Sequence, residues 1–240
     1  MQRNSTITSR IAEMAGDGMS RCAVPGCGQP SMRVEGVGLD GHHCKRHVIH
    51  RQRHGSTWFG TFKRSEVLPY MRAAKSYITP RLLGDRTIKE AVTRLAVVIE
   101  QAPFEANTRI HGLNARIRAD IAFGRLRVRG VKPETVLAIH LAITILIEEH
   151  RACPRSREFR IVQVAKMVHR RASGYHRVWQ DPGGGPLRTE LHKYARSSGR
   201  VLRLIGERIE ECCEFATADH ADAVLDLKVK RYGKYLSTVM

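Results

Sequence analysis

The sequence predicts a mainly α-helical protein that begins with a small module of a different kind. Three cysteines and several histidines crowd into residues 22–54, whereas the chain after about residue 63 carries apolar residues at helical spacing. The run from Thr135 to Ile147 is apolar on every side of a helix, which indicates a buried central helix. We therefore expect a flexible N-terminus over 1–20, a small module over 21–62, a helical domain over 63–180 and C-terminal helices over 187–240.

The composition points to a polyanionic partner. The 240 residues are 42% hydrophobic, enough to bury a core without disulfide bonds, and 41 Lys and Arg face 23 Asp and Glu for a net charge of +18. Such a balance favours nucleic acid or an anionic membrane surface. No apolar run reaches the roughly 20 residues of a membrane span, and the first 21 residues lack the apolar stretch typical of a signal peptide, so we expect a cytoplasmic protein without a membrane partner.

The helical domain starts with a periodic segment over 65–77, placed after a boundary near Lys63. The next helix runs from a capping-box pair, Thr87 and Glu90, to Pro103. Residues 106–122 are also expected to form a helix. The stretch 109–132 then holds seven basic residues and one acid, which predicts a basic face, and the alternation of Arg125, Arg127 and Arg129 with apolar neighbours favours a short extended segment.

Two further helices follow before a flexible loop. Pro133 opens the apolar central helix, which continues to about residue 151, and His140 within it is expected to be a hydrogen-bonded core histidine. A helix starts at Ser156, and the Gly/Pro-rich residues 181–186 predict a linker. From about Leu187 we expect one or two long helices. Seven acids and one base lie between residues 205 and 226, which predicts a solvated acidic face, or one that docks on the basic body or on a second subunit.

Four residues near the N-terminus have the spacing of metal ligands. Cys22 and Cys27 are separated by four residues, and after sixteen more Cys44 and His47 are separated by two. Paired ligands on short turns bring three thiolates and one imidazole to a tetrahedral zinc ion, and Pro25-Gly26 suits the first turn. Since all four positions would come from the protein, we expect one structural Zn²⁺. His43 is the alternative to His47, and Cys153, Cys212 and Cys213 are interpreted as buried thiols.

The residues after Cys44 predict contact with nucleic acid. Residues 41–65 contain six basic residues, five histidines and no acid. A zinc-anchored helix with a cationic flank suits phosphate contact, and Arg side chains also reach base edges. For Trp58, Phe59 and Phe62 we expect packing of the module ahead of base stacking. The predicted nucleic-acid contacts are Lys45, Arg46, Arg51, Arg53, Lys63, Arg64, Arg116, Arg125, Arg127 and Arg129.

Residues 22–55 carry a resemblance to a known type of module. CAVPGCGQP followed by GHHCKRHVIHRQRHG resembles the small C-x4-C…C-x2-H zinc modules of bacteriophage and mobile-element proteins, found in DNA-binding proteins and beside HNH-type endonucleases. Val48 stands where such modules carry a tyrosine, and the insert before Cys44 is somewhat long. The resemblance covers about a seventh of the chain. It implies a DNA-binding zinc finger in a phage, mobile element or bacterium.

These observations predict a zinc-stabilised protein that binds nucleic acid, double-stranded DNA ahead of RNA, with a role in transcription regulation or genome maintenance. An HNH-like endonuclease is one alternative, although no asparagine stands between Asn4 and Asn107 to complete its site, and we assign no catalytic residue. An RNA- or ribosome-associated factor is another. A homodimer through the helical domain or the acidic C-terminal helices is compatible with each.

Overall fold

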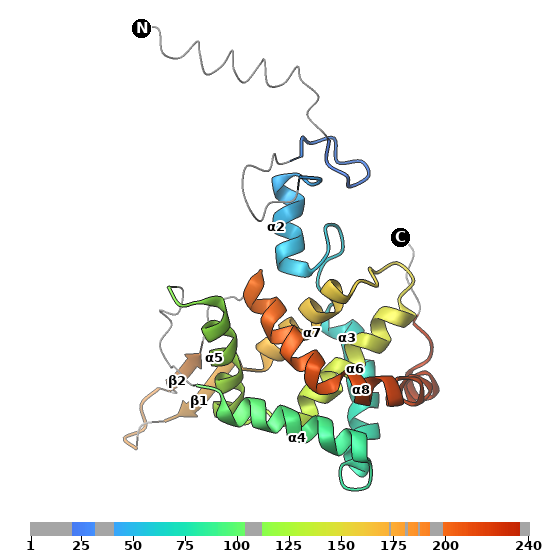
Figure 1. The fold of residues 1–240 in the computed structure, drawn as a ribbon. Coiled ribbons are helices and arrows are strands. Elements are labelled where there is room, and N and C mark those ends of the chain that lie inside the picture. Colours follow the sequence, from blue (N-terminus) through green and yellow to red (C-terminus); the bar gives the residue numbers. More distant parts are fainter. Residues whose placement is uncertain are drawn as a thin grey trace, which may run out of the picture. The chain divides into compact units, whose positions relative to one another are not determined.

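The computed structural model describes residues 21–31, 41–103, 112–172, 174–180, 182–186, 188–192 and 199–235. The chain divides into two compact units, Met1–Gly60 and Thr61–Met240, which are treated separately (Figure 1). The described residues form seven α-helices and one two-stranded hairpin. The prediction of a mainly α-helical chain is therefore confirmed.

The described part of the first unit consists of a turn and one helix. An isolated bridge joins Arg21 to Pro30, and α2 spans Lys45–His54. The helix ends at Gly55, which has a φ of 77° and donates its backbone N–H to the carbonyl of Arg51. Since a left-handed residue at this position suits glycine, Gly55 explains why the helix stops there.

The second unit begins with α3 (Arg64–Ile78), which leads through the 3-10 turn η1 (Thr79–Arg81) to α4 (Arg86–Gln101). Asp85 starts α4, because its carboxylate accepts the backbone N–H of Ile88 at 3.0 Å. The cap is thus Asp85, and not the Thr87 and Glu90 pair that the sequence indicates. The next helix, α5 (Ala115–Val128), is capped by Asn114.

The centre of the second unit is α6 (Pro133–Glu149), which starts at the predicted proline. Every residue from Val136 to Ile147 is buried, because α6 packs against α3, α4, α7 (Arg157–Ala172) and α8 (Arg200–Tyr232). His140 accepts or donates a hydrogen bond of 2.8 Å with Thr217, as expected of a core histidine. The apolar run is therefore the core of the unit.

The long α8 contacts α3, α4, α5, α6 and α7. It approaches α7 closely at Gly206, where an added Cβ atom would collide with the backbone carbonyl of Ile161. Beside this contact the buried Glu210 accepts hydrogen bonds from Arg157 and Arg160, both at 2.6 Å. One member of the acidic segment therefore docks on the basic side of its own helical unit.

The end of α8 is held by a second carboxylate, that of the partly buried Glu149. Glu149 accepts hydrogen bonds from Tyr70 at 2.5 Å, from Lys228 at 2.5 Å and from the backbone N–H of Tyr235 at 2.6 Å. Burial alone would raise the pKa of Glu149, but these donors and the charge of Lys228 lower it overall. The charged form of Glu149 thus joins α3, α6 and α8.

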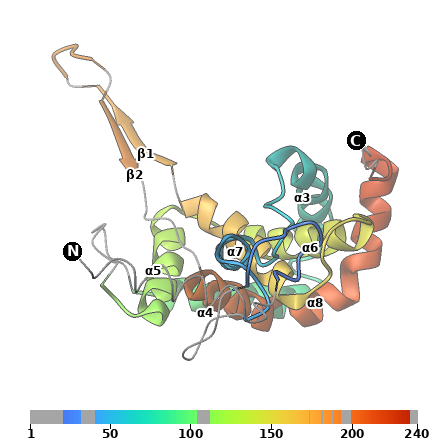
Figure 2. The same cartoon turned by 90° about the horizontal axis from the view of Figure 1, so that it is seen from above.

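Two local predictions are wrong. Residues 125–128 belong to α5, and not to an extended segment, because the helical spacing places Ile121, Ala122 and Arg125 on one buried side. Residues 188–192 form a strand, where the sequence predicts helix. This strand, β2 (Arg188–His192), pairs antiparallel with β1 (Gly174–Trp179), so the Gly/Pro-rich segment connects two strands of a hairpin (Figure 2).

Among the described residues, no single helix has the length and apolar composition that crossing a bilayer requires. The consecutive helices α5 and α6 meet that requirement only when they are taken together, and they are bent by 118°. Within the unit, α6 is buried by its neighbouring helices.

Candidate metal centre

The first pair of sulfur ligands lies on a tight turn. Cys27 donates its backbone N–H to the carbonyl of Val24 at 3.1 Å, which closes a turn around Pro25 and Gly26. Gly26 has a φ of 76°, the conformation that a type II turn needs after proline. Cys22 is tied to the same loop, since its backbone N–H reaches the carbonyl of Gln29 at 2.9 Å.

The second pair of ligands lies at the start of α2. Cys44 is the N-cap residue, and the helix hydrogen bond from Val48 to its carbonyl measures 3.0 Å. His47 follows in the first turn, and a spacing of three in a helix brings two side chains to the same face. A backbone hydrogen bond of 2.8 Å from Ala23 to the carbonyl of His42 joins the two loops.

These elements bring the four predicted ligands together. The ligand atoms of Cys22, Cys27, Cys44 and His47 all lie within 4.8 Å of one another. The Nδ1 atom of His47 lies 3.2 Å from the sulfur of Cys22 and 3.4 Å from that of Cys44, and the sulfurs of Cys27 and Cys44 are 3.7 Å apart. The group could hold one metal ion, and within the described residues it contains His47 and not His43.

The surroundings of the thiols favour the metal-binding form of one of them. Burial by itself raises the pKa of Cys22, but hydrogen bonds from the backbone of Cys44 and Val24 and from His47 and Cys27 lower it to about 6. The backbone of Gln29 lowers the pKa of Cys27, yet burial and the neighbouring thiols raise it overall. At neutral pH the Cys22 thiolate is therefore favoured, and the thiolate is the form that binds a metal.

A cationic groove of about 930 Å³ lies beside the metal centre, within the first unit. We call it the module groove. Gln29, Pro30 and Ser31 form one wall, and α2 contributes Lys45, Arg46, Ile49, His50, Arg53 and His54, with Cys44 at its end. Among the described residues, no acidic one lines it. The sequence indicated the cations but not the wall, because tertiary contacts such as the hydrogen bond from Ala23 to His42 bring this loop to the start of the helix.

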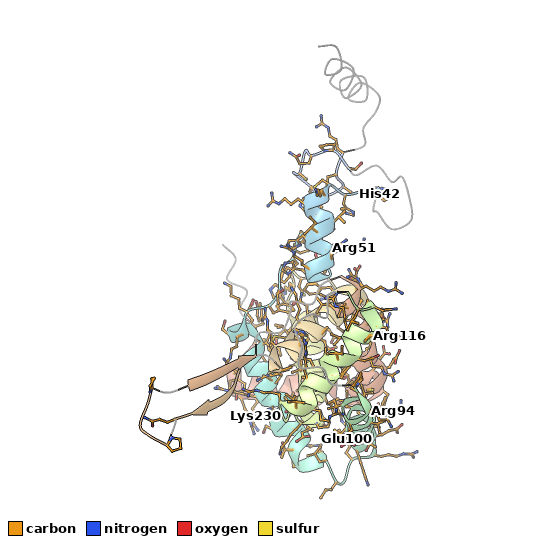
Figure 3. The ribbon with its side chains drawn as sticks, turned by 90° about the vertical axis from the view of Figure 1, so that its left-hand side faces the viewer. His42, Arg51, Arg94, Glu100, Arg116 and Lys230 are labelled. Atoms are coloured by element: carbon orange, nitrogen blue, oxygen red, sulfur yellow. The ribbon has the colours of Figure 1, made fainter. Side chains whose placement is uncertain are left out.

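The predicted nucleic-acid contacts on α2 are all exposed, namely Lys45, Arg46, Arg51 and Arg53. Three of them line the module groove, whereas Arg51, labelled in Figure 3, does not. His50 donates its ring N–H to the carbonyl of Ser56 at 2.7 Å, which fixes the chain after the helix. The exposed cations thus lie on the same short helix whose start carries the possible ligands Cys44 and His47.

The remaining predicted contacts lie in the second unit and have different surroundings. Lys63, Arg64 and Arg116 are exposed (Figure 3 labels Arg116 on α5), and Arg129 is half-buried. The exposed Arg127 donates to the backbone carbonyl of Glu100 at the end of α4. Arg125 is only 1% exposed, so the prediction that it contacts phosphate is wrong. Its position on the packed side of α5 is the physical reason.

The other three cysteines belong to the second unit. Cys153, Cys212 and Cys213 are buried, as the sequence indicates. Burial raises the pKa of Cys153 to about 11, and its thiol donates to the carbonyls of Ile147 and His150, both at 3.3 Å. These thiols are protonated packing residues at neutral pH.

The sequence matches no protein-family model, and no curated protein and no solved structure matches it. The assignment of a function therefore depends on the residues and geometry of the chain itself.

Proposed function

We propose that the first unit is a zinc-stabilised module that binds nucleic acid, with double-stranded DNA as the favoured partner. The module groove is the observation that carries the proposal, because a groove lined by three cationic side chains lies directly beside a group of four possible metal ligands. By its resemblance to phage and mobile-element modules, the protein acts in transcription regulation or genome maintenance.

The distances among the ligands support zinc as the metal. With Zn–S bonds of about 2.3 Å and a Zn–N bond of about 2.0 Å, tetrahedral geometry places two sulfurs about 3.8 Å apart and sulfur about 3.5 Å from nitrogen. The corresponding separations here are 3.7 Å between sulfurs, and 3.2 and 3.4 Å between sulfur and nitrogen. Three thiolates and an imidazole are also ligands that zinc prefers.

A four-ligand site supports a structural and not a catalytic role for the metal. Catalytic zinc keeps one position open for water or substrate, whereas Cys22, Cys27, Cys44 and His47 supply four ligands. The binding interpretation is therefore preferred to the HNH-like nuclease. In the binding interpretation the ion holds the turn of residues 22–30 against the start of α2.

The module groove supports phosphate and base contact. Lys45, Arg46 and Arg53 reach solvent from one side of α2, and Arg side chains bind both phosphates and guanine edges. Trp58 is 57% exposed and offers a stacking surface in the same unit. DNA is preferred to RNA because an exposed helix enters the major groove of B-form DNA, whereas the major groove of duplex RNA is narrow and deep.

The metal is tested by measuring zinc in the purified protein and then in Cys44→Ser. We expect one zinc per chain and its loss in the variant, since a missing ligand opens the site. A full equivalent of zinc retained by Cys44→Ser would contradict the ligand set.

The partner is tested by titrating labelled duplex DNA, single-stranded DNA and duplex RNA with the zinc-loaded chain at two salt concentrations. Arg53→Ala should weaken duplex binding by roughly three- to tenfold, and Arg51→Ala is the matched control, because both residues are exposed on α2 but only Arg53 lines the module groove. Cleavage of the DNA on addition of Mg²⁺ would favour the nuclease. Tighter binding to RNA would move the function to RNA.

Neither test addresses the expected homodimer or the cytoplasmic location, which stay predictions. Sedimentation of the zinc-loaded chain with and without DNA checks the first of them.

A further inference from the structure

A second cationic groove lies within the second unit, between α3 and α7. It has a volume of about 240 Å³, and we call it the α3–α7 groove. Its cations are Arg64, Arg72 and Lys75 from α3 and Arg171 from α7, all of them exposed. Its apolar lining is Val67, Leu68, Met71 and Met167. The groove therefore combines a positive rim with an apolar floor.

The helical spacing of α3 produces this arrangement. Arg64, Leu68, Arg72 and Lys75 follow one another at intervals of four, four and three residues, so they form one stripe along the helix. At 1.5 Å per residue, the stripe extends about 16 Å from the first cation to the last. That length accommodates more than one phosphate of an extended nucleic-acid strand. Arg171 on α7 supplies a cation on the opposite side.

The charge of the α3–α7 groove is not neutralised by its neighbours. Within the described ranges, no acidic residue lines it and its four cations form no ion pair. Like charges held together in this way repel one another and attract an anion.

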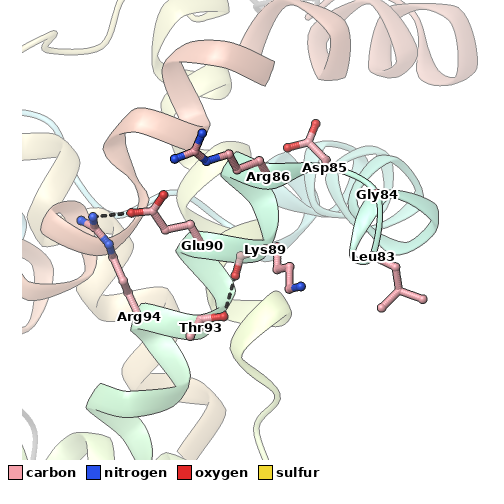
Figure 4. A pocket seen from close by; sticks show the side chains of 8 residues that line it. All are labelled: Leu83, Gly84, Asp85, Arg86, Lys89, Glu90, Thr93 and Arg94. Atoms are coloured by element: carbon pink, nitrogen blue, oxygen red, sulfur yellow. Dashed lines mark hydrogen bonds and ion pairs between the residues drawn. The ribbon is translucent and has the colours of Figure 1, made fainter.

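Another pocket of the same unit makes the contrast clear. The pocket at the start of α4 holds three cations, Arg86, Lys89 and Arg94, but also two acids (Figure 4). Its Glu90 lies 2.5 Å from Arg94 in an ion pair, and its Asp85 is engaged as the cap of α4. The α4 pocket thus has acids beside its cations, whereas the lining of the α3–α7 groove has none.

The floor of the α3–α7 groove suits a flat aromatic ring. Met71 and Met167 are buried on its inner side, and thioether groups make favourable contacts with aromatic rings. An amphipathic acidic helix would need a row of apolar anchors over two or more turns, whereas 240 Å³ matches a ligand of about the size of one nucleotide. Phosphates on the rim and one base on the floor satisfy both parts of the groove.

We propose that the α3–α7 groove binds single-stranded nucleic acid, with one unpaired base against Met71 and Met167 and the adjacent phosphates on the four cations. A paired and stacked base cannot present its face to the floor, so the strand must be single. The proposal rests on the proposed function in one respect, namely that the partner is a nucleic acid. It adds a second site, with a different form of nucleic acid, to a chain whose first unit favours duplex DNA.

The first test uses the full zinc-loaded chain, labelled dT12 and a labelled 12-base-pair duplex. Arg72→Ala with Lys75→Ala should weaken dT12 binding about tenfold and flatten its salt dependence, while duplex binding changes less than twofold. The matched control is Arg86→Ala with Lys89→Ala, which removes the same charge from exposed positions on α4. Equal losses in the two double variants, or no loss of dT12 binding, would overturn the proposal.

The second test asks whether a base is bound and needs no variant. An abasic 12-mer carries the same phosphates as dT12, so we expect it to bind the unaltered chain several times more weakly. Equal binding of the two would remove the base from the groove, and displacement of dT12 by poly-glutamate as efficient as by unlabelled dT12 would show a general polyanion site. Either result overturns the proposal.

The two proposals fail separately. If Arg53→Ala loses duplex binding but Arg72→Ala with Lys75→Ala leaves dT12 binding unchanged, the proposed function stands and the single-strand site is overturned. If Arg53→Ala leaves duplex binding unchanged but the α3 double variant loses dT12 binding, the single-strand site stands and the duplex-binding role of the first unit is overturned.

Discussion

The two units of the chain are held together by different means. In the described part of the first unit the buried apolar side chains are Cys22, Cys44 and Val48, and two of these three belong to the group that could hold a metal ion. In the second unit α6 alone buries twelve consecutive residues. So small a core gives little apolar stabilisation, and the proposed metal ion would supply the rest, whereas the helical unit is stabilised by apolar burial. The difference between the units predicts that they lose their structure independently.

The largest expected effect would separate the two units completely. Cys44→Ser, or a strong chelator, should abolish the structure of the first unit, because metal binding of the order of 10 kcal/mol organises such modules. The helices of the second unit should keep their far-ultraviolet circular dichroism and their melting temperature. A simultaneous loss of the helical signal of the second unit would contradict the independence of the two units.

A core substitution should give the opposite pattern. Leu141 is fully buried in α6, so Leu141→Ala should destabilise the second unit by about 2–5 kcal/mol and lower its melting temperature by roughly 5–15 °C. Zinc content should stay at one per chain. The exposed Leu83→Ala is the control and should change stability little.

Acid should weaken the second unit through His140. Burial, with a smaller contribution from the charge of Arg160, lowers the pKa of His140 to about 3. Between its unfolded pKa of about 6.5 and this value, the unfolded chain binds a proton that the folded chain does not, so stability falls as pH falls, by about 1.4 kcal/mol per pH unit.

Urea unfolding at pH 7 and pH 5 measures this effect. Burial also lowers the pKa of His169, in the same unit, to about 4, so this histidine adds a similar slope over the same pH range. His140→Gln, which cannot titrate, should therefore lose about half of the pH dependence, whereas the exposed His42→Gln should retain it. An unchanged slope in His140→Gln would show that other groups cause the acid sensitivity of the helical unit.

The smallest effect concerns one helix end of the second unit. Asp85→Ala removes the cap of α4, which should cost about 1 kcal/mol. Hydrogen bonds to the backbone N–H of Ile88 and to Thr87, together with His220, lower the pKa of Asp85, so its contribution is present above about pH 4 and is lost as the carboxylate is protonated. Asp85→Asn should retain much of the stability, and thermal melting of both variants checks the order.

Much of this architecture could be predicted from local patterns. Cys22, Cys27, Cys44 and His47 were identifiable because metal ligands follow strict spacing, and Pro133 marked the start of the central helix. Arg125 was misassigned because alternation over five residues fits a strand and a helix end equally, and only packing against other elements decides between them.

The features that escaped prediction depend on residues far apart in the chain. The α3–α7 groove joins Met71 to Met167, and no local pattern relates two positions nearly one hundred residues apart. The hairpin of β1 and β2 was missed because its Gly/Pro-rich loop is equally typical of a linker between helices.

The contacts of α8 with five other helices have a consequence during synthesis. The apolar surface of α6 is made by about residue 149, but α8, which covers part of it, begins only at Arg200. While the ribosome adds the intervening residues, the nascent chain exposes a strongly apolar helix that has no complete partner set. At typical elongation rates of about 5–20 residues per second, this interval lasts several seconds. That is long enough for a chaperone to bind α6 before α8 covers the same apolar surface.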